Sequence, residues 1–352
     1  MTIGIRTDDF SIVRPASNLI VCTRDLDYGV GSQVKYELTQ FDSDSSIKSV
    51  TVIGPKRLEG YSNKIKFEII PNKGRFFITK EPWFAFQCNR KIMEVIKREK
   101  VDTIYLHFPV FANPYGVETI RKVHLLHRSI IRRYPRTPFF IAGAFFHYLY
   151  SYFDWRTIKY ASQVQFVGRT VMQDAERFYP QYKHKFKHQP NTIDKKIFFR
   201  VSEQERHEFK KILGLDENKI NILFVGRLEP LKGIALVLKV LEAINQTDIR
   251  LMVIGDGPFK DKVVAFPFVD YHGKVQHGEM HKYYNACDLV VIPSYYETFG
   301  LVAFEALACG CRILSRNFGD VQFAVGAESI FTDDKEFAWK LKRILADFQR
   351  GS

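Results

Sequence analysis

Short apolar runs alternate with longer amphipathic segments along most of this chain. In the first half, runs rich in Ile, Val and Phe are typical of strands that a parallel sheet buries on both faces. These runs lie at residues 17–23, 49–54, 64–70, 103–108, 138–143 and 163–168. Segments with helical periodicity separate them, at residues 84–97, 117–134, 155–160 and 170–178, and a further helix is predicted to begin at Val34. The alternation predicts a doubly wound parallel sheet.

The alternation stops after residue 180 and starts again near residue 220. The segment between is basic and polar, has Pro190 at its centre, and leads into a charged helix at residues 202–213. Strands are then predicted at residues 221–226, 250–255, 267–273, 288–293 and 311–315, and helices at residues 233–245, 258–264, 280–286 and 335–348. The fold class is therefore α/β, with two Rossmann-like doubly wound domains at residues 1–190 and 191–334 and a C-terminal helix in residues 335–352.

Composition fits this picture and narrows the class of protein. A chain of 352 residues with 46% hydrophobic residues is typical of a folded protein of two average domains. No apolar run approaches the ~18 residues of a membrane-spanning helix, and the first residues are too polar for a signal peptide. The five cysteines show no metal-ligand spacing and indicate reduced thiols. The expected location is cytoplasmic.

Positive charge is concentrated in one part of the chain. Residues 119–200 hold sixteen Lys and Arg but four Asp and Glu, so this window accounts for most of the net charge of +13. Nucleic acid, an anionic membrane surface or a phosphorylated substrate would each explain such an excess.

The most informative stretch is residues 294–310, SYYETFGLVAFEALACG, which follows an apolar strand. It predicts a helix beginning near Leu301 at the carboxyl end of a strand, where free backbone N–H groups suit phosphate. Glu297 would lie on the loop and Glu305 one turn into the helix. The simpler interpretation is a buried helix with two solvated glutamates.

Other strand ends supply further candidates. Residues 226–233, GRLEPLKG, place Arg227 and Lys232 where both would complement a diphosphate, although both could be ordinary surface residues. Residues 255–258, GDGP, are typical of a turn, and the loop at Gly273–Val275 could offer backbone groups to a planar base. Residues 27–33 form a Gly-rich corner that lacks the third glycine of the dinucleotide fingerprint.

Two histidines follow strand-like runs in the first half, His107 and His147. A lone histidine after an apolar strand is more often structural than catalytic. The sequence shows no nucleophile elbow, no Walker loop, no HExxH motif and no Cys/His cluster.

Together the segments GRLEPLKG, GDGP and ACDLVVIPSYYETFGLVAFEALACG resemble the C-terminal half of family 4 retaining glycosyltransferases, enzymes of the GT-B fold. In that fold two Rossmann-like domains face each other across a cleft. The resemblance is closest from about Asn221 to Gly310, and the spacing of Glu297 and Glu305 is its most specific part. QPNTIDKKIF, at residues 189–198, resembles the interdomain segment of the family, with Thr192 where glycine is usual. Residues 1–180 resemble the family only in the layout of their predicted strands and helices.

The resemblance implies a role for each motif of the second half. Arg227 and Lys232 would hold the diphosphate of a nucleotide-sugar, and Glu305 would bind the ribose hydroxyls. Glu297 would contact the donor sugar. The remaining implied contacts come from backbone groups: those of Phe299, Gly300 and Leu301 on the phosphates or sugar, those of Gly29 and Gly31 on the same phosphates, and those of Gly273 and Val275 on the nucleobase.

Family members usually carry a histidine just after the fifth strand of the first domain. The run at residues 138–143 would be that strand, so His147 is favoured over His107 for this role. The segment at residues 143–161 is short for the family, which implies fewer acceptor contacts. The final helix, residues 335–348, is expected to pack back onto the first domain.

The resemblance predicts a hexosyltransferase-type enzyme that moves a sugar from a UDP- or GDP-sugar to a glycan or lipid-linked acceptor with retention. No cofactor and no metal ion are expected, because Arg227, Lys232 and a helix N-terminus can stabilise the charge of the leaving diphosphate. The basic side chains at residues 121–136 and 183–188 suggest a peripheral contact with an anionic membrane, with a solvated amphipathic helix as the alternative. The rival function is a nucleic-acid- or carbohydrate-binding protein on a degenerate GT-B scaffold; nucleic acid is disfavoured by the intact Arg227, Lys232, Glu297 and Glu305.

Overall fold

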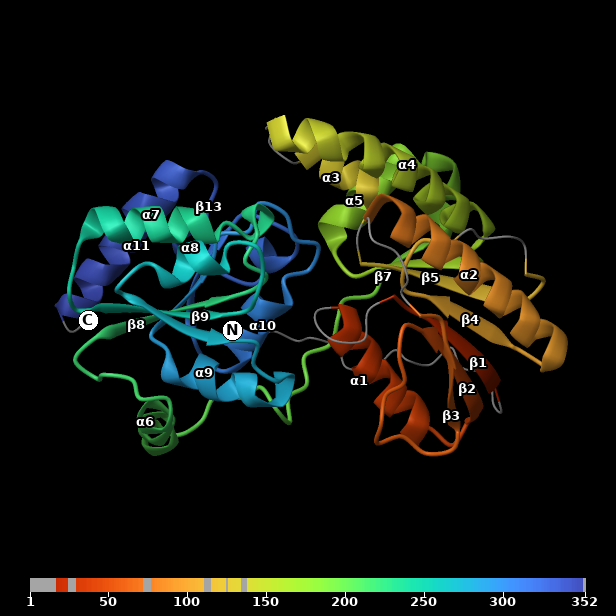
Figure 1. The fold of residues 1–352 in the computed structure, drawn as a ribbon, viewed down its shortest axis with the longest axis horizontal. Helices are drawn as coiled ribbons and strands as arrows, with labels where there is room; N and C mark the ends of the chain where they lie inside the picture. The colour runs from red at the N-terminus through yellow and green to blue at the C-terminus, as the bar shows by residue number, and fades with distance from the viewer. Residues whose placement is uncertain are drawn as a thin grey trace. The chain divides into compact units, whose positions relative to one another are not determined.

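In this computed structural model the structure describes residues 17–24, 30–71, 77–110, 115–124, 126–133 and 138–350. The chain divides into two compact units, unit 1 with Met1–Thr192 and unit 2 with Ile193–Ser352. Each unit is built around one parallel sheet (Figure 1).

The sheet of unit 1 has the strand order β3-β2-β1-β4-β5-β6-β7, and every neighbouring pair is parallel. Its strands are β1 Ser17–Cys22, β2 Ile47–Gly54, β3 Ile65–Ile69, β4 Thr103–Leu106, β5 Glu118–Val123, β6 Gln163–Phe166 and β7 Phe186–His188. The helices are α1 Val30–Ser43, α2 Phe77–Arg98, α3 His127–Arg133, α4 Pro138–Tyr160 and α5 Arg169–Phe178, followed by the 3-10 helix η1 Pro180–Lys185. Because β1 lies between β2 and β4, the order of the strands reverses there.

Helices cover both faces of this sheet. The apolar side of α1, with Val34 and Leu38, packs on one face, and the apolar side of α2, with Phe84 and Ile92, packs on the other. The described part of α4 joins α5 against β5 and β6, where Ile158 is buried. The predicted fold class is confirmed for this unit.

Two predicted elements of unit 1 are wrong. Residues 117–134 were expected to form a helix, but β5 occupies Glu118–Val123 and α3 begins at His127. Residues 138–143 were expected to form a strand, but they begin α4. A short apolar run does not distinguish a strand from a buried helix, and Pro138 suits the first turn of a helix. The helix α1 also begins at Val30, earlier than the predicted Val34.

The sheet of unit 2 has the order β10-β9-β8-β11-β12-β13 and is also parallel throughout. Its strands are β8 Ile220–Val225, β9 Ile249–Ile254, β10 Val269–Gly273, β11 Leu289–Ile292, β12 Arg312–Arg316 and β13 Ile330–Phe331. The helices are α6 Glu203–Ile212, α7 Ile234–Ile244, α8 Lys260–Val264, α9 Met280–Ala286, α10 Leu301–Ala308 and α11 Asp334–Gln349. Short 3-10 helices lie at η2 Pro230–Lys232, η3 His277–Glu279, η4 Val321–Phe323 and η5 Ala327–Ser329.

In unit 2, α7 and α11 cover one face of the sheet and α9 lies on the opposite face (Figure 1). The apolar side of α11, which includes Phe337 and Leu341, is buried in the core of unit 2 with α7. These apolar residues are therefore part of the core of unit 2.

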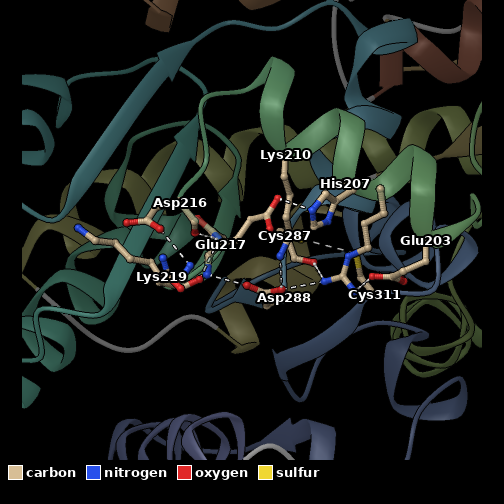
Figure 2. Close-up of polar contacts among 12 residues, drawn as sticks. Glu203, His207, Lys210, Asp216, Glu217, Lys219, Cys287, Asp288 and Cys311 are labelled. Carbon is tan, nitrogen blue, oxygen red and sulfur yellow. Dashed lines mark hydrogen bonds and ion pairs between the residues drawn. The ribbon is translucent and has the colours of Figure 1, made fainter.

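At the amino end of β11, Asp288 attaches α6 to the sheet. Its Oδ1 accepts hydrogen bonds from Arg206 Nη2 at 2.7 Å and Lys210 Nζ at 3.2 Å. Its Oδ2 accepts one from the backbone N–H of Asn221 at 2.8 Å. Figure 2 shows Lys210 and Asp288 meeting at this edge. Asp288 therefore has a structural role at the amino edge of the sheet, whereas the candidate site lies at the opposite edge, where the strands end.

Candidate functional site

The order of the strands in unit 2 reverses between β8 and β11. The chain runs from β8 outward through β9 and β10 on one side and from β11 through β12 on the other. The loops at the carboxyl ends of β8 and β11 therefore diverge, which is where open α/β sheets bind their ligands. These two loops are residues 226–233 and 293–300, the segments that the sequence singled out.

An ion pair joins the two loops at this point. Lys232 Nζ makes a very short contact with Glu297 Oε1, and the same oxygen accepts a hydrogen bond from Ser294 Oγ at 3.2 Å. The side chains of Lys232 and Glu297 are 20% and 24% exposed, so a ligand can reach both. The structure thus places two of the predicted site residues in direct contact. Ser294 is an additional member whose role the sequence did not indicate.

Glycines allow the backbones of neighbouring loops to approach closely at this edge. Gly233 has a positive φ of 74° and precedes α7; a Cβ there would lie 2.5 Å from Pro293 O. A Cβ on Gly255 would lie 1.9 Å from Gly226 O. No side chain fits at such distances. The segment 255–258, predicted as a turn, therefore also packs directly against the loop that carries Lys232.

Arg227 lies on the same loop but away from that pair. Its side chain is 72% exposed and its Nη2 lies 2.8 Å from Glu229 Oε1. A guanidinium with this exposure keeps most of its donors available for an anion.

The N-terminus of α10 completes this edge. Leu301 is the first helical residue, and Gly300 precedes it with a φ of 92°. A Cβ on Gly300 would lie 2.8 Å from the ring of Phe318. Phe299 is buried and stacks on Phe304 with ring centroids 4.4 Å apart. The first N–H groups of a helix have no partner within the helix, so this fixed turn suits the anion-binding role predicted for residues 299–301.

Glu305 is not next to Glu297 but on the buried side of α10. Its Oε1 lies 3.0 Å from His277 Nε2, and its Oε2 accepts a hydrogen bond from Tyr284 Oη at 2.8 Å. Burial, and then the charge of Glu305, raise the pKa of Tyr284 well above its usual value, so Tyr284 remains a donor. The interpretation of both glutamates as solvated is wrong. His277 is a partner that sequence reasoning missed, although it lies two residues beyond the predicted loop at Gly273–Val275.

That loop lies at the end of β10. Gly273 has a φ of 66° and its carbonyl accepts a hydrogen bond from Gly255 N at 2.7 Å. Val275 is partly buried against the core that also contains α9. These positions lie at the same edge of the sheet as Lys232, and nothing in the structure tests a contact with a base.

Of the predicted sites in unit 1, Gly29 lies outside the described residues. Gly31 is buried in the first turn of α1. His147 lies within α4 and not after a strand, which removes the positional reason for choosing it; its side chain is outside the described residues. The structural fifth strand is β5, and the residue that directly follows it is His124. Sequence reasoning missed His124 because it interpreted this segment as a helix.

His124 is part of a buried polar cluster. Its Nε2 lies 3.1 Å from His107 Nδ1, and the two rings stack with centroids 5.3 Å apart. His107 Nε2 lies 3.3 Å from Glu37 Oε2, and Glu37 Oε1 accepts a hydrogen bond from Lys122 Nζ at 2.5 Å. Burial alone would raise the pKa of Glu37, but Lys122, and then His107, more than offset it and hold that pKa well below its usual value. We call Glu37, His107, Lys122 and His124 the Glu37 cluster.

Arg121 occupies the opposite face of β5. Successive residues of a strand point to opposite faces, so Arg121 meets Asp154 of α4 while Lys122 meets Glu37 of α1. Arg121 Nη2 lies 3.8 Å from Asp154 Oδ1, and its Nη1 donates to Leu106 O at 3.0 Å. Burial lowers the pKa of Arg121 to about 10.

These positions correct the expected membrane surface. Arg121 and Lys122 are buried in a strand and do not lie on an exposed helix. Arg128 in α3 is exposed and its guanidinium lies 5.1 Å from the ring centroid of Phe178. The side chains of Arg132, Arg133 and Arg136 are outside the described residues.

Two kinds of feature are absent from the described residues, a metal-binding group and a membrane-spanning helix. Across the described parts of both units, no three or more His, Cys, Asp or Glu side chains are grouped so that they could hold a metal ion. Among the described helices, none combines the length and apolar character needed to cross a membrane.

The two parallel sheets, each covered by helices, define a GT-B fold. Sucrose-phosphate synthase from Thermosynechococcus elongatus superimposes with a TM-score of 0.76 at 19% identity, over 94% of this chain and 90% of that one. WaaG, a glycosyltransferase involved in lipopolysaccharide biosynthesis, gives 0.77 at 14% identity, over 93% and 90%. HepE of Anabaena in complex with UDP and glucose gives 0.66 at 15% identity, over 95% and 91%. At such identities the likeness shows the fold alone.

The second unit carries a match to a known family. Residues 205–350 match the model of the family Glycosyl transferases group 1. An uncharacterized glycosyltransferase of Methanocaldococcus jannaschii is 30% identical over 161 residues, which is 42% of this chain and 41% of that protein. A D-inositol 3-phosphate glycosyltransferase of Mycobacterium sp. strain KMS is 34% identical over 134 residues, 34% of this chain and 30% of that protein. The matches thus span less than half of these relatives.

Proposed function

We propose that this protein is a retaining glycosyltransferase that moves a hexose from a UDP- or GDP-sugar to a glycan or lipid-linked acceptor. The observation that carries the proposal is the Lys232–Glu297 ion pair at the switch point of a sheet in the Glycosyl transferases group 1 family. A partly exposed cation beside a helix N-terminus suits the diphosphate of a nucleotide-sugar.

In this proposal the charge that develops on the leaving diphosphate is stabilised by Lys232, Arg227 and the N–H groups that precede and begin α10. Such donors are effective because they are held in place before the reaction. Glu297, held by Lys232 and Ser294, contacts hydroxyls of the donor sugar. Structural neighbours support this class of donor: HepE of Anabaena was solved with UDP and with UDP-glucose.

Glu305 is proposed to bind the ribose hydroxyls. A carboxylate has about four acceptor positions, and His277 and Tyr284 occupy one on each oxygen. The remaining positions suit two neighbouring hydroxyl groups. In unit 1, we assign the role expected of His147 to His124, since His124 directly follows the fifth strand.

The proposed reaction needs no metal ion, because the cationic groups named above supply the positive charge. Unchanged turnover after dialysis against EDTA is the expected result; loss of turnover that Mg²⁺ or Mn²⁺ restores would refute this part.

A peripheral membrane contact remains a proposal on a smaller surface than the sequence suggested. The middle of α4 exposes Tyr148 and Tyr152. Nearer its end, Arg156 and Lys159 stack on neighbouring aromatic rings. Aromatic and basic residues together are typical of membrane interfaces. Flotation with anionic and with neutral vesicles tests it: recovery with anionic vesicles alone is expected, and equal recovery with both would refute it.

Thermal shift with UDP, GDP, ADP and a control DNA duplex tests the function. Stabilisation by one nucleotide, reduced in Lys232→Ala, is expected. Stabilisation by the duplex alone would favour the rival binding protein. Release of sugar from a panel of nucleotide-sugars then identifies the donor, and a nucleotide that binds without turnover of any donor would support a degenerate scaffold.

A further inference from the structure

The Glu37 cluster fixes the donor and acceptor roles along a series of polar contacts. Three of its side chains follow one another from α1 to the ends of β4 and β5: Glu37, then His107, then His124. All three are buried, at 2%, 3% and 8% exposure. An ionised carboxylate can only accept hydrogen bonds, so it determines which nitrogen of the next ring carries the proton.

The first step is the contact between Glu37 and His107. Glu37 Oε2 and His107 Nε2 are 3.3 Å apart, longer than an ideal hydrogen bond. Neither of these two buried atoms makes a hydrogen bond with good geometry among the described residues, so each is the nearest polar partner that the other has. If His107 presented a lone pair here, two acceptors would face each other without solvent. The proton of neutral His107 therefore lies on Nε2, toward the carboxylate.

The second step follows from the first. With its proton on Nε2, His107 has a lone pair on Nδ1, which lies 3.1 Å from His124 Nε2. His124 must then donate from Nε2, and its own Nδ1 is left with a lone pair. Both rings stay neutral, since burial lowers the pKa of each below its ordinary value. Lys122 already balances the charge of Glu37, and Arg121 nearby disfavours a further cation.

We propose that Glu37, acting through His107, holds His124 as a hydrogen-bond acceptor that binds a hydroxyl group of the substrate. In this scheme Glu37 and His107 are positioning residues, and His124 Nδ1 is the atom that meets the hydroxyl. The assignment of a carbohydrate hydroxyl rests on the proposed function, whereas the donor and acceptor roles of the three side chains rest on unit 1 alone. The edge at which β4 and β5 end, next to the strand-order reversal at β1, is where such a fold places ligands.

The variant Glu37→Gln reverses the donor and acceptor roles along this series of contacts. The ammonium of Lys122 can only donate, so the amide oxygen of Gln would face Lys122 and the amide NH₂ would face His107. His107 would then accept at Nε2 and donate from Nδ1 to His124 Nε2. As a result the proton of His124 moves to Nδ1, and the acceptor becomes a donor. Asp154→Asn is the matched control, because it makes the same change in the other buried ion pair of β5.

The tautomers are measured by ¹⁵N–¹H correlation spectra of protein labelled in histidine, with His107→Gln and His124→Gln to assign the two rings. The expected result is protonated Nε2 on both rings in the wild type and in Asp154→Asn, and protonated Nδ1 on both in Glu37→Gln. Turnover in Glu37→Gln should fall about tenfold, the effect of one lost hydrogen bond, with a smaller change in KM for the donor.

Protonated Nδ1 on His124 in the wild type would overturn the proposal, and this spectrum decides even if Glu37→Gln does not fold. Reversed tautomers with unchanged turnover would overturn the use of the lone pair. If no nucleotide-sugar is turned over at all, the proposed function fails. The spectra still test the hydrogen-bonding roles of Glu37, His107 and His124.

Discussion

The two units place charged side chains at corresponding edges of similar sheets, but they bury them to very different degrees. In unit 2, Lys232 and Glu297 are 20% and 24% exposed and lie on loops. In unit 1, the side chains of Lys122 and Glu37 are 7% and 3% exposed and lie on a strand and a helix. The partly exposed charges on the loops keep their contact with water, so they can change partners when a ligand binds. The buried charges of unit 1 have little contact with water, so each needs its partner of opposite charge. The comparison predicts that mutations of the unit 2 pair mainly change ligand binding and turnover. Mutations of the unit 1 pair should mainly change the free energy of unfolding.

The largest expected effect is on the stability of unit 1. Lys122→Met removes the cation from Glu37 and leaves a buried carboxylate with no counter-charge, which costs about 3–5 kcal/mol. Urea unfolding measures this change. The control is Lys91→Met, which removes a partly exposed ion pair with Glu94 of α2 and should cost less than about 1 kcal/mol. Equal losses in the two variants would contradict the distinction between buried and exposed pairs.

The next effect is on turnover through unit 2. Lys232→Ala removes a donor that we place on the leaving diphosphate, and loss of one such preorganised donor lowers kcat by about 10²–10³. The stability of this variant should change by less than about 1 kcal/mol, since the pair is partly exposed and lies on loops. Steady-state kinetics and urea unfolding of the same preparation measure both. A stability loss like that of Lys122→Met, with kcat unchanged, would reverse the comparison.

The two glutamates of unit 2 should differ from each other. Glu305→Gln alters the carboxylate held by His277 and Tyr284 and should weaken nucleotide binding by about 1.5–3 kcal/mol, the range for hydrogen bonds to a charged group. Glu297→Gln should mainly lower turnover. Titration calorimetry with the nucleotide and kinetics with the nucleotide-sugar separate the two. Wild-type values for both variants would refute the site.

How far the sequence predicted the structure also differs between the units. The five strands predicted for unit 2 are present, because most of them are apolar runs that end at or next to a Gly or Pro. The motifs put Lys232 and Glu297 at the carboxyl ends of β8 and β11, and the structure brings the two side chains into contact. In unit 1 the sequence failed at β5. The partners that neutralise Lys122 and Arg121 are Glu37 and Asp154, 85 and 33 residues away, and no local pattern reveals such partners. The pattern of apolar positions likewise does not predict the polar contacts of Glu305 with His277 and Tyr284.

The smallest expected effect is the pH dependence that the two buried histidines give to unit 1. Burial lowers the pKa of both His107 and His124 in the folded state, whereas the unfolded chain has the ordinary value of about 6.5. Below that pH the unfolded chain binds more protons than the folded one, so the free energy of unfolding falls as the pH falls. Each histidine contributes at most about 1.4 kcal/mol per pH unit. Urea unfolding at about pH 7.5 and about pH 5.5 measures the loss, and the double variant His107→Gln/His124→Gln should show a smaller one. An equal loss in the double variant would mean that other groups, exposed and outside the Glu37 cluster, carry the pH dependence.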